Sequence, residues 1–80
     1  NRPNPFRDQT IIGFSVPEAT DATLTVLDVT GKQVKVLEGF VTKGYHEWLV
    51  KDLGTHQSGV LYYMLQTDQH SAVRKMVRIE

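Results

Sequence analysis

Apolar and polar residues alternate along most of this chain with a period of two, the pattern of strands that bury one face. Six stretches rich in β-branched, aromatic or aliphatic residues show it, and no window has a convincing helical period. The predicted strands are Thr10–Val16, Ala22–Asp28, Val34–Phe40, Tyr45–Val50, Val60–Thr67 and Ser71–Ile79. With Asn4–Phe6 as a short entry strand, the sequence predicts an all-β fold, a seven-stranded antiparallel immunoglobulin-like β-sandwich.

The connectors between these stretches carry residues suited to turns. Gly31 and Gly44 tolerate the positive φ that tight turns require, and Asp28 can accept hydrogen bonds from its own turn. Gly59 precedes a strand of bulky residues, which predicts a bulge or an unusual φ at the strand entry. Leu53, in the longest connector, is expected to close one end of the core.

The apolar positions that share a face within each strand predict the core. Its expected members are Ile12, Phe14, Val16, Leu24, Val26, Val34, Leu37, Trp48, Leu61, Tyr63, Leu65, Val77 and Ile79. In the last strand the two alternating faces are Val73, Lys75, Val77, Ile79 and Ala72, Arg74, Met76, Arg78. We expect the valines and Ile79 to face inward, with Lys75 at a rim or a bulge shifting the phase. Arg74, Met76 and Arg78 would then form an exposed basic stripe.

Length and charge narrow the function classes. Eighty residues form a single domain, residues 1–80, and the absence of cysteine excludes disulfides and thiolate metal sites. Nine basic and nine acidic side chains without a block of one sign argue against nucleic acid as a partner. No apolar run approaches the ~20 residues that a membrane-spanning helix needs. The chain does not open with a signal peptide, so an export signal would belong to a longer parent.

Candidate chemistry is sparse. His46, His56 and His70 lack the spacing of a zinc site, and the scattered aspartates do not form a calcium loop, so we expect no metal and no cofactor. The serines have no neighbouring histidine–carboxylate arrangement, and we expect no enzymatic activity. The aromatic residues Tyr45, Trp48, Tyr62 and Tyr63 could form a sugar-binding platform, but alternation places Trp48 and Tyr63 inward and the other two outward.

Four pieces of sequence, in order along the chain, point to a family. They are Asn4-Pro5-Phe6 followed by a polar spacer and the strand ending at Pro17, then Asp28–Val34, Ser58–Tyr63 and Arg74–Ile79. Together they resemble the C-terminal sorting domains of the bacterial type IX secretion system, of the Por secretion tail type. The family pattern usually reads Leu-x-x-Gly-x-Tyr around Gly59, whereas this chain has His56 and Leu61 in the outer positions.

The resemblance implies a non-catalytic secretion signal attached to an N-terminal cargo domain. The parent would pass through the periplasm, meet the outer-membrane translocon and reach the cell surface or the medium, and a sortase-like protease would remove the tag. We expect the translocon to recognise Gly59, Tyr62, Lys75, Met76, Val77 and Arg78. The alternative is that the charges of the last strand only protect an open edge from aggregation. Cleavage is expected within Asn1, Arg2, Pro3 and Asn4, taken to be a flexible entry. An edge strand could also support a weak homodimer.

Three other functions stay open at the level of the sequence. The chain could be an immunoglobulin-like structural spacer, a carbohydrate-binding module of a secreted enzyme or a protein-docking module of another kind. A sorting domain is expected to end its parent chain, whereas a spacer would be followed by another domain.

Overall fold

A computed structural model describes residues 1–53 and 59–79, and these residues form an all-β fold without a helix. Six strands follow one another: β1 (Thr10–Val16), β2 (Thr20–Leu27), β3 (Gln33–Val41), β4 (Gly44–Val50), β5 (Gly59–Thr67) and β6 (Ser71–Arg78). Each predicted strand is present, with ends that differ by at most two residues. The seventh is not: Phe6 forms only an isolated bridge, so the described residues hold six strands rather than seven.

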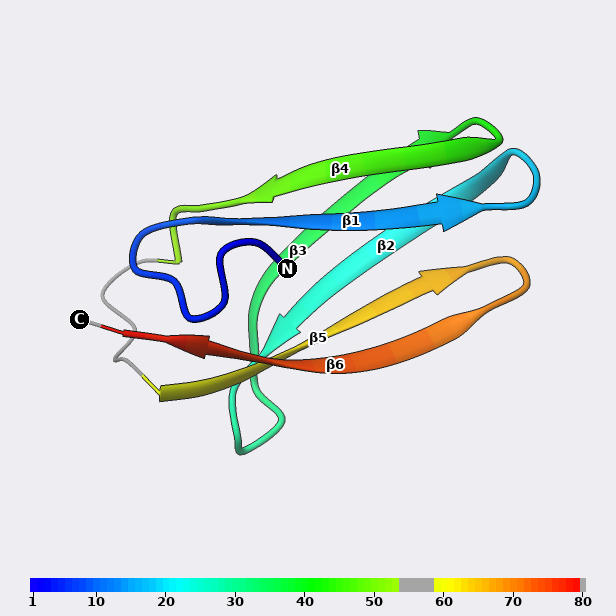
Figure 1. Cartoon of the computed structure of the whole chain (residues 1–80). Helices are drawn as coiled ribbons and strands as arrows, with labels where there is room; N and C mark the ends of the chain where they lie inside the picture. The colour runs from blue at the N-terminus through cyan, green and yellow to red at the C-terminus, as the bar shows by residue number, and fades with distance from the viewer. Residues whose placement is uncertain (54–58, 80) are drawn as a thin grey trace.

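The strands form two antiparallel sheets (Figure 1). One contains only β1 and β4, and the other has the order β3-β2-β5-β6. The central strands β2 and β5 pair with each other, which leaves β3 and β6 at the two edges of the larger sheet. The entry segment, residues 1–9, lies between the start of β1 and the end of β6 (Figure 1).

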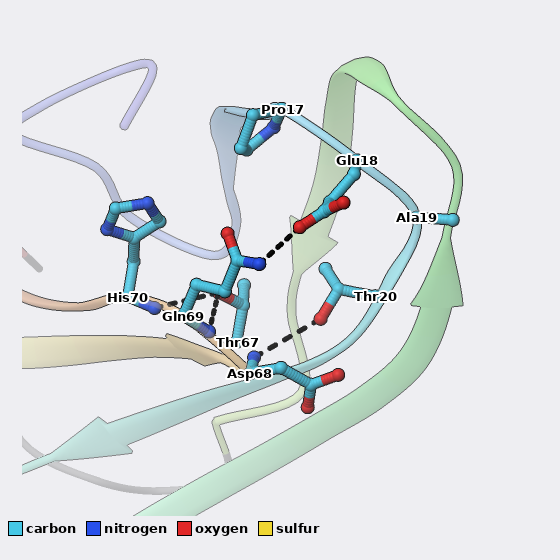
Figure 2. A pocket seen from close by; sticks show the side chains of 8 residues that line it. All are labelled: Pro17, Glu18, Ala19, Thr20, Thr67, Asp68, Gln69 and His70. Atoms are coloured by element: carbon cyan, nitrogen blue, oxygen red, sulfur yellow. Dashed lines mark hydrogen bonds between the residues drawn. The ribbon is translucent and has the colours of Figure 1, made fainter.

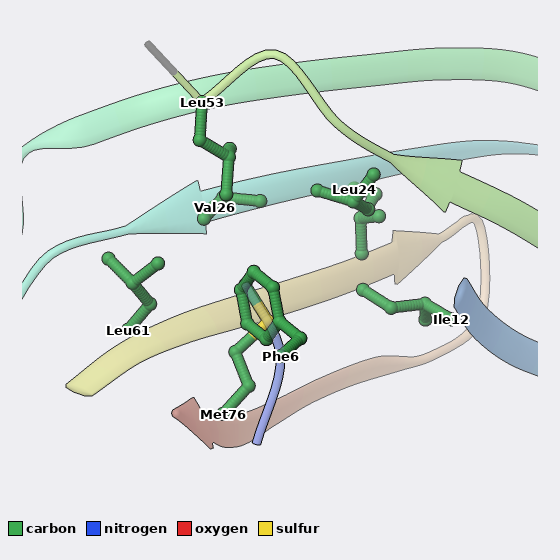
Figure 3. Packing of buried hydrophobic residues seen from close by; sticks show 8 residues of the cluster. Phe6, Ile12, Leu24, Val26, Leu53, Leu61 and Met76 are labelled. Carbon is green, nitrogen blue, oxygen red and sulfur yellow. The ribbon is translucent and has the colours of Figure 1, made fainter. Parts of the chain in front are cut away.

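The main core lies between the two sheets and is closed by side chains from the connectors (Figure 3). The predicted Ile12, Leu24, Val26 and Leu61 are fully buried in it, and Leu53 closes one end as expected. A second, smaller cluster contains Phe14 and Val16. Five predicted members are only partly buried against these clusters, namely Val34, Leu37, Trp48, Tyr63 and Leu65. The buried residues that the prediction missed are Phe6, Ala22, Val41, Val50 and Met76.

The predicted orientation of β6 is wrong. Met76 is 0% exposed and lies in the core, whereas Val73 is 52% exposed and Ile79 is 39% exposed. The cause lies in the hairpin, because β6 takes its phase from β5: Leu61 faces Met76 across the pair, and Leu61 is buried. Pairing with β5 thus decides which face of β6 is buried, although the β-branched residues of β6 are more numerous on its other face. The exposed basic stripe that we expected therefore does not include Met76.

The turn chemistry follows the sequence. Gly31, Gly44 and Gly59 have φ values of 87°, 122° and 128°, in the region that glycine tolerates best. The Asp28 carboxylate accepts hydrogen bonds from the backbone N–H groups of Thr30 (2.9 Å) and Lys32 (3.0 Å). These contacts fix the β2–β3 turn, as predicted for an aspartate in that position.

Candidate functional site

The β5–β6 hairpin has a charge distribution that differs from that of the rest of the chain. Its two strands carry three basic side chains, Arg74, Lys75 and Arg78, and no acidic one. The whole chain has nine of each sign, so the remainder holds six basic and nine acidic side chains. Because β6 is an edge strand, this local excess of positive charge lies at the border of the larger sheet.

The structure brings most of the predicted recognition residues together on this hairpin. Lys75 lies opposite Tyr62, Val77 lies opposite Val60, and Gly59 lies opposite Arg78. Lys75 is exposed, and Tyr62, Val77 and Arg78 are half-buried. Met76 and Arg78 project from the opposite face of β6: Met76 enters the core, and the Arg78 guanidinium donates to the Arg7 carbonyl oxygen (3.1 Å). A partner that docks on the folded domain can therefore contact the others but not the Met76 side chain.

The outer face of the larger sheet carries a row of apolar side chains, which the predicted core does not include. One row across the sheet runs from Val36 through Thr25 and Met64 to Val73. Thr25 is buried even though it belongs to the outer face, because Val36 and Met64 flank it on both sides. Val36 and Val73 remain exposed at the ends of the row. Lys75 thus stands beside an apolar surface.

The entry segment closes the C-terminal half of the β6 edge. Phe6 donates its backbone N–H to the Val77 carbonyl oxygen (2.9 Å) and accepts from the Ile79 N–H (2.7 Å). The Asn4 side-chain oxygen accepts the Val77 N–H at 2.9 Å. The Phe6 side chain is buried in the core beside Met76 (Figure 3). No local pattern indicates this contact, because the residues involved are about 70 positions apart.

The same entry segment also joins the smaller sheet. Arg2 and Ile11 exchange both backbone hydrogen bonds, at 2.7 and 2.8 Å. The Arg2 guanidinium forms an ion pair with Glu47 on β4, and the Thr10 hydroxyl donates to the Pro3 carbonyl oxygen (2.9 Å). The entry segment therefore fastens both sheets to each other. We expected residues 1–4 to form a flexible entry, whereas the structure shows hydrogen bonds at the backbone of Arg2 and at the Pro3 carbonyl oxygen.

The end of the hairpin borders two open depressions, and its aromatic residues do not form a platform. One depression, of about 360 Å³, is lined by Arg78 together with Asp8, Asp52 and Leu53. The other, of about 390 Å³, lies between the entry segment and Ile79.

A cavity of about 50 Å³ lies between the β1–β2 and β5–β6 turns (Figure 2), which is far below the several hundred Å³ of typical ligand sites. Its polar contacts are structural: the Asp68 N–H donates to the Thr20 hydroxyl at 3.2 Å, and Gln69 contacts Glu18 (Figure 2).

The four aromatic residues considered for sugar binding are divided between different surfaces. Tyr45 lies on the outer face of the smaller sheet, where its hydroxyl reaches over Gly13 and donates to Glu47 (3.2 Å). Tyr62 lies on the outer face of the other sheet, and Trp48 and Tyr63 pack against the core. The described part of the chain thus presents no row of stacked rings for a glycan.

Within residues 1–53 and 59–79, acidic and histidine side chains nowhere gather in a group of three that could hold a metal ion. His56 and Ser58 lie outside these described residues. In the same residues there is also no helix with the length and apolarity to cross a membrane.

Comparison with known proteins agrees with the order of motifs along the chain. The family model described as a secretion system C-terminal sorting domain matches residues 3–80, nearly the whole sequence. Neither a curated protein nor a solved structure matches it. The match confirms the resemblance that Asn4-Pro5-Phe6 and the later motifs carry. The chain belongs to the family of type IX secretion system C-terminal sorting domains.

Proposed function

We propose that this domain is recognised in its folded form by the type IX outer-membrane translocon through the exposed part of the β5–β6 hairpin. The observation that carries the proposal is the concentration of three cations, without an anion, on these two strands of a sorting domain. Complementary charge guides a partner to the correct surface and excludes wrong ones. Lys75 supplies charge on the outer face, where Tyr62 and Val77 supply adjoining contact area, and Arg78 supplies charge from the opposite face at the end of the strand.

The two remaining residues of the predicted recognition set act through the fold. Met76 fills the core and holds β6 against Phe6, so it positions its exposed neighbours without touching a partner. Gly59 adopts a φ of 128°, which starts β5 opposite Arg78. A side chain at Gly59 would strain this backbone conformation and disturb the pairing that presents Arg78.

Membership of the family supports a route for the domain and its cargo. The domain travels with an attached cargo through the periplasm, and the cargo then reaches the cell surface or the medium. A sortase-like protease removes the domain within residues 1–4. Because Arg2 is paired with Ile11, this cut requires the entry segment to leave β1 first. Proteases bind extended, unpaired backbone, so release of the entry segment controls access to the bond.

A fusion tests the proposal. Residues 1–80 are placed behind a signal peptide and a fluorescent reporter in a bacterium that has a functional type IX system. The expected result is reporter at the cell surface or in the medium, and the same fusion should stay in the periplasm of a strain without the translocon. Intact, folded fusion that stays in the periplasm of the competent strain would overturn the proposal.

The processing step has its own measurement. Mass spectrometry of the released reporter is expected to show a new C-terminus at or before Asn4. Replacing Arg2 with Ala removes the ion pair to Glu47 and should speed cleavage. A cut inside one of the core strands would contradict this part of the proposal.

A further inference from the structure

The β6 edge is closed at one end and open at the other. Backbone groups of a strand point alternately to its two sides. The backbone N–H and C=O groups of Val77 and the N–H group of Ile79 point outward and bond to the entry segment, whereas Arg78, which lies between them, pairs with β5. The same alternation directs the N–H and C=O groups of Ser71, Val73 and Lys75 outward. Within the described residues no further strand pairs with these three on that outward side, although each faces a β5 residue on the other.

The open stretch has the size of a strand-addition site. From Ser71 to Lys75 it spans about 13 Å at roughly 3.3 Å per residue, enough for a segment of about five residues. The Val73 carbonyl oxygen already accepts a hydrogen bond from the Arg74 guanidinium at 3.0 Å. An incoming strand that bears a carboxylate would bind this guanidinium and so free the carbonyl group. The entry segment shows that the same edge accepts a paired backbone.

The side chains along the open edge indicate the partner. Val73 ends the apolar row of the outer face, and Lys75 follows it on that face, with Arg74 projecting from the other. No acidic residue lies on β5 or β6. A segment that pairs here is complementary if it has an apolar residue opposite Val73 and carboxylates opposite Arg74 and Lys75.

We propose that the receptor adds an extended acidic segment as a new strand along Ser71–Lys75 of β6. This proposal rests on the function proposed above and specifies how the receptor recognises the β5–β6 hairpin. Backbone hydrogen bonds provide affinity in this mode of recognition, and alternate side chains provide specificity. The entry segment limits the new strand to this half of the edge, because Asn4 and Phe6 occupy the other half.

A synthetic peptide tests the proposal on the isolated domain. The peptide Thr-Glu-Glu-Val-Glu-Glu-Thr reads the same in both directions, so it fits a parallel or an antiparallel addition. Binding is followed by amide spectra and hydrogen exchange. At saturation the Val73 and Lys75 amides should exchange at least about tenfold more slowly, because their N–H groups become hydrogen-bonded.

Two matched peptides separate strand addition from attraction of charge. One carries N-methyl groups on the valine and the glutamates beside it, which removes backbone donors and keeps every charge. The other has lysine in place of each glutamate. Both should bind at least about tenfold more weakly. Equal binding of the N-methylated peptide, or spectral changes centred on the β1–β4 sheet, would overturn strand addition.

A variant links this mode to transport. Val73→Pro removes an outward-facing N–H group, which leaves the β5 ladder intact, and Val73→Ala is the control that keeps the N–H. We expect only the proline variant to lose peptide binding and cargo delivery. Suppose that folded Val73→Pro delivers its cargo normally, while replacement of Lys75 and Arg78 abolishes delivery. This result would overturn strand addition but would still support the sorting function. If Val73→Pro does not fold, the N-methylated peptide decides the question.

Discussion

The orientation of β6 can be tested by comparing two truncations on its opposite faces. Met76→Ala removes a fully buried side chain, and Val73→Ala shortens one that is half exposed. Replacing a buried methionine with alanine costs about 2–5 kcal/mol, because the surrounding core only partly collapses into the cavity. Val73 loses two methyl groups of which about half the surface was already in water, which costs about 1 kcal/mol or less.

Urea unfolding, followed by the fluorescence of Trp48, measures both free energies of unfolding. Trp48 reports on the core because it packs edge-on against Phe14, with ring centroids 5.2 Å apart. For a domain of this size, 1 kcal/mol corresponds to about 6 °C in melting temperature. Met76→Ala should therefore lower the melting temperature by about 12–30 °C, and Val73→Ala by no more than about 6 °C. Equal losses, or a larger loss for Val73→Ala, would refute the observed phase of β6.

Two further predictions concern the entry segment and the start of β5. Phe6→Ala should lower the free energy of unfolding by about 3–5 kcal/mol, since Phe6 is 1% exposed. As a control, replacing the exposed Arg7 with Ala should lower it by less than about 1 kcal/mol. Similar melting temperatures of the two variants would contradict the closing role of the entry segment. Gly59→Ala should lower the free energy of unfolding by about 1–3 kcal/mol through backbone strain. Gly39→Ala should be tolerated, because Gly39 has no positive φ and an added methyl group meets only ordinary contact with Trp48. A larger loss of stability for Gly39→Ala, measured by calorimetry, would refute this explanation.

Local patterns were sufficient to predict the strands and turns of this domain. Alternation located each strand to within two residues, since a sheet with a buried face requires that period. Asp28 and Gly31 identified their turn because few other residues satisfy its backbone. The predicted core positions Leu24 and Val26 of β2 were also correct, because both sides of that strand are paired, although the buried Ala22 was missed.

The errors arose where long-range pairing decides the structure. The three-residue stretch around Phe6 is too short to show a period, and its partners Val77 and Ile79 come from the other end of the chain. The phase of β6 could not be read from its own residues, because its valines outnumber Met76 and only the register with β5 selects the buried face. Part of the recognition set was thereby misplaced, although its charged members do lie on the exposed hairpin.

We expect the cations of β6 to serve transport rather than stability. Lys75→Gln with Arg78→Gln removes two of them, and Lys32→Gln with Lys43→Gln removes the same charge from two exposed turns. The first pair also loses the hydrogen bond from Arg78 to the Arg7 carbonyl oxygen, and a bond of about 1 kcal/mol corresponds to about 6 °C in melting temperature.

The decisive measurement is delivery of a fused cargo to the cell surface by these two double variants, with folding verified for each. The account predicts that the β6 variant leaves its cargo in the periplasm and that the turn variant delivers it normally. Normal delivery by the folded β6 variant would contradict this expectation.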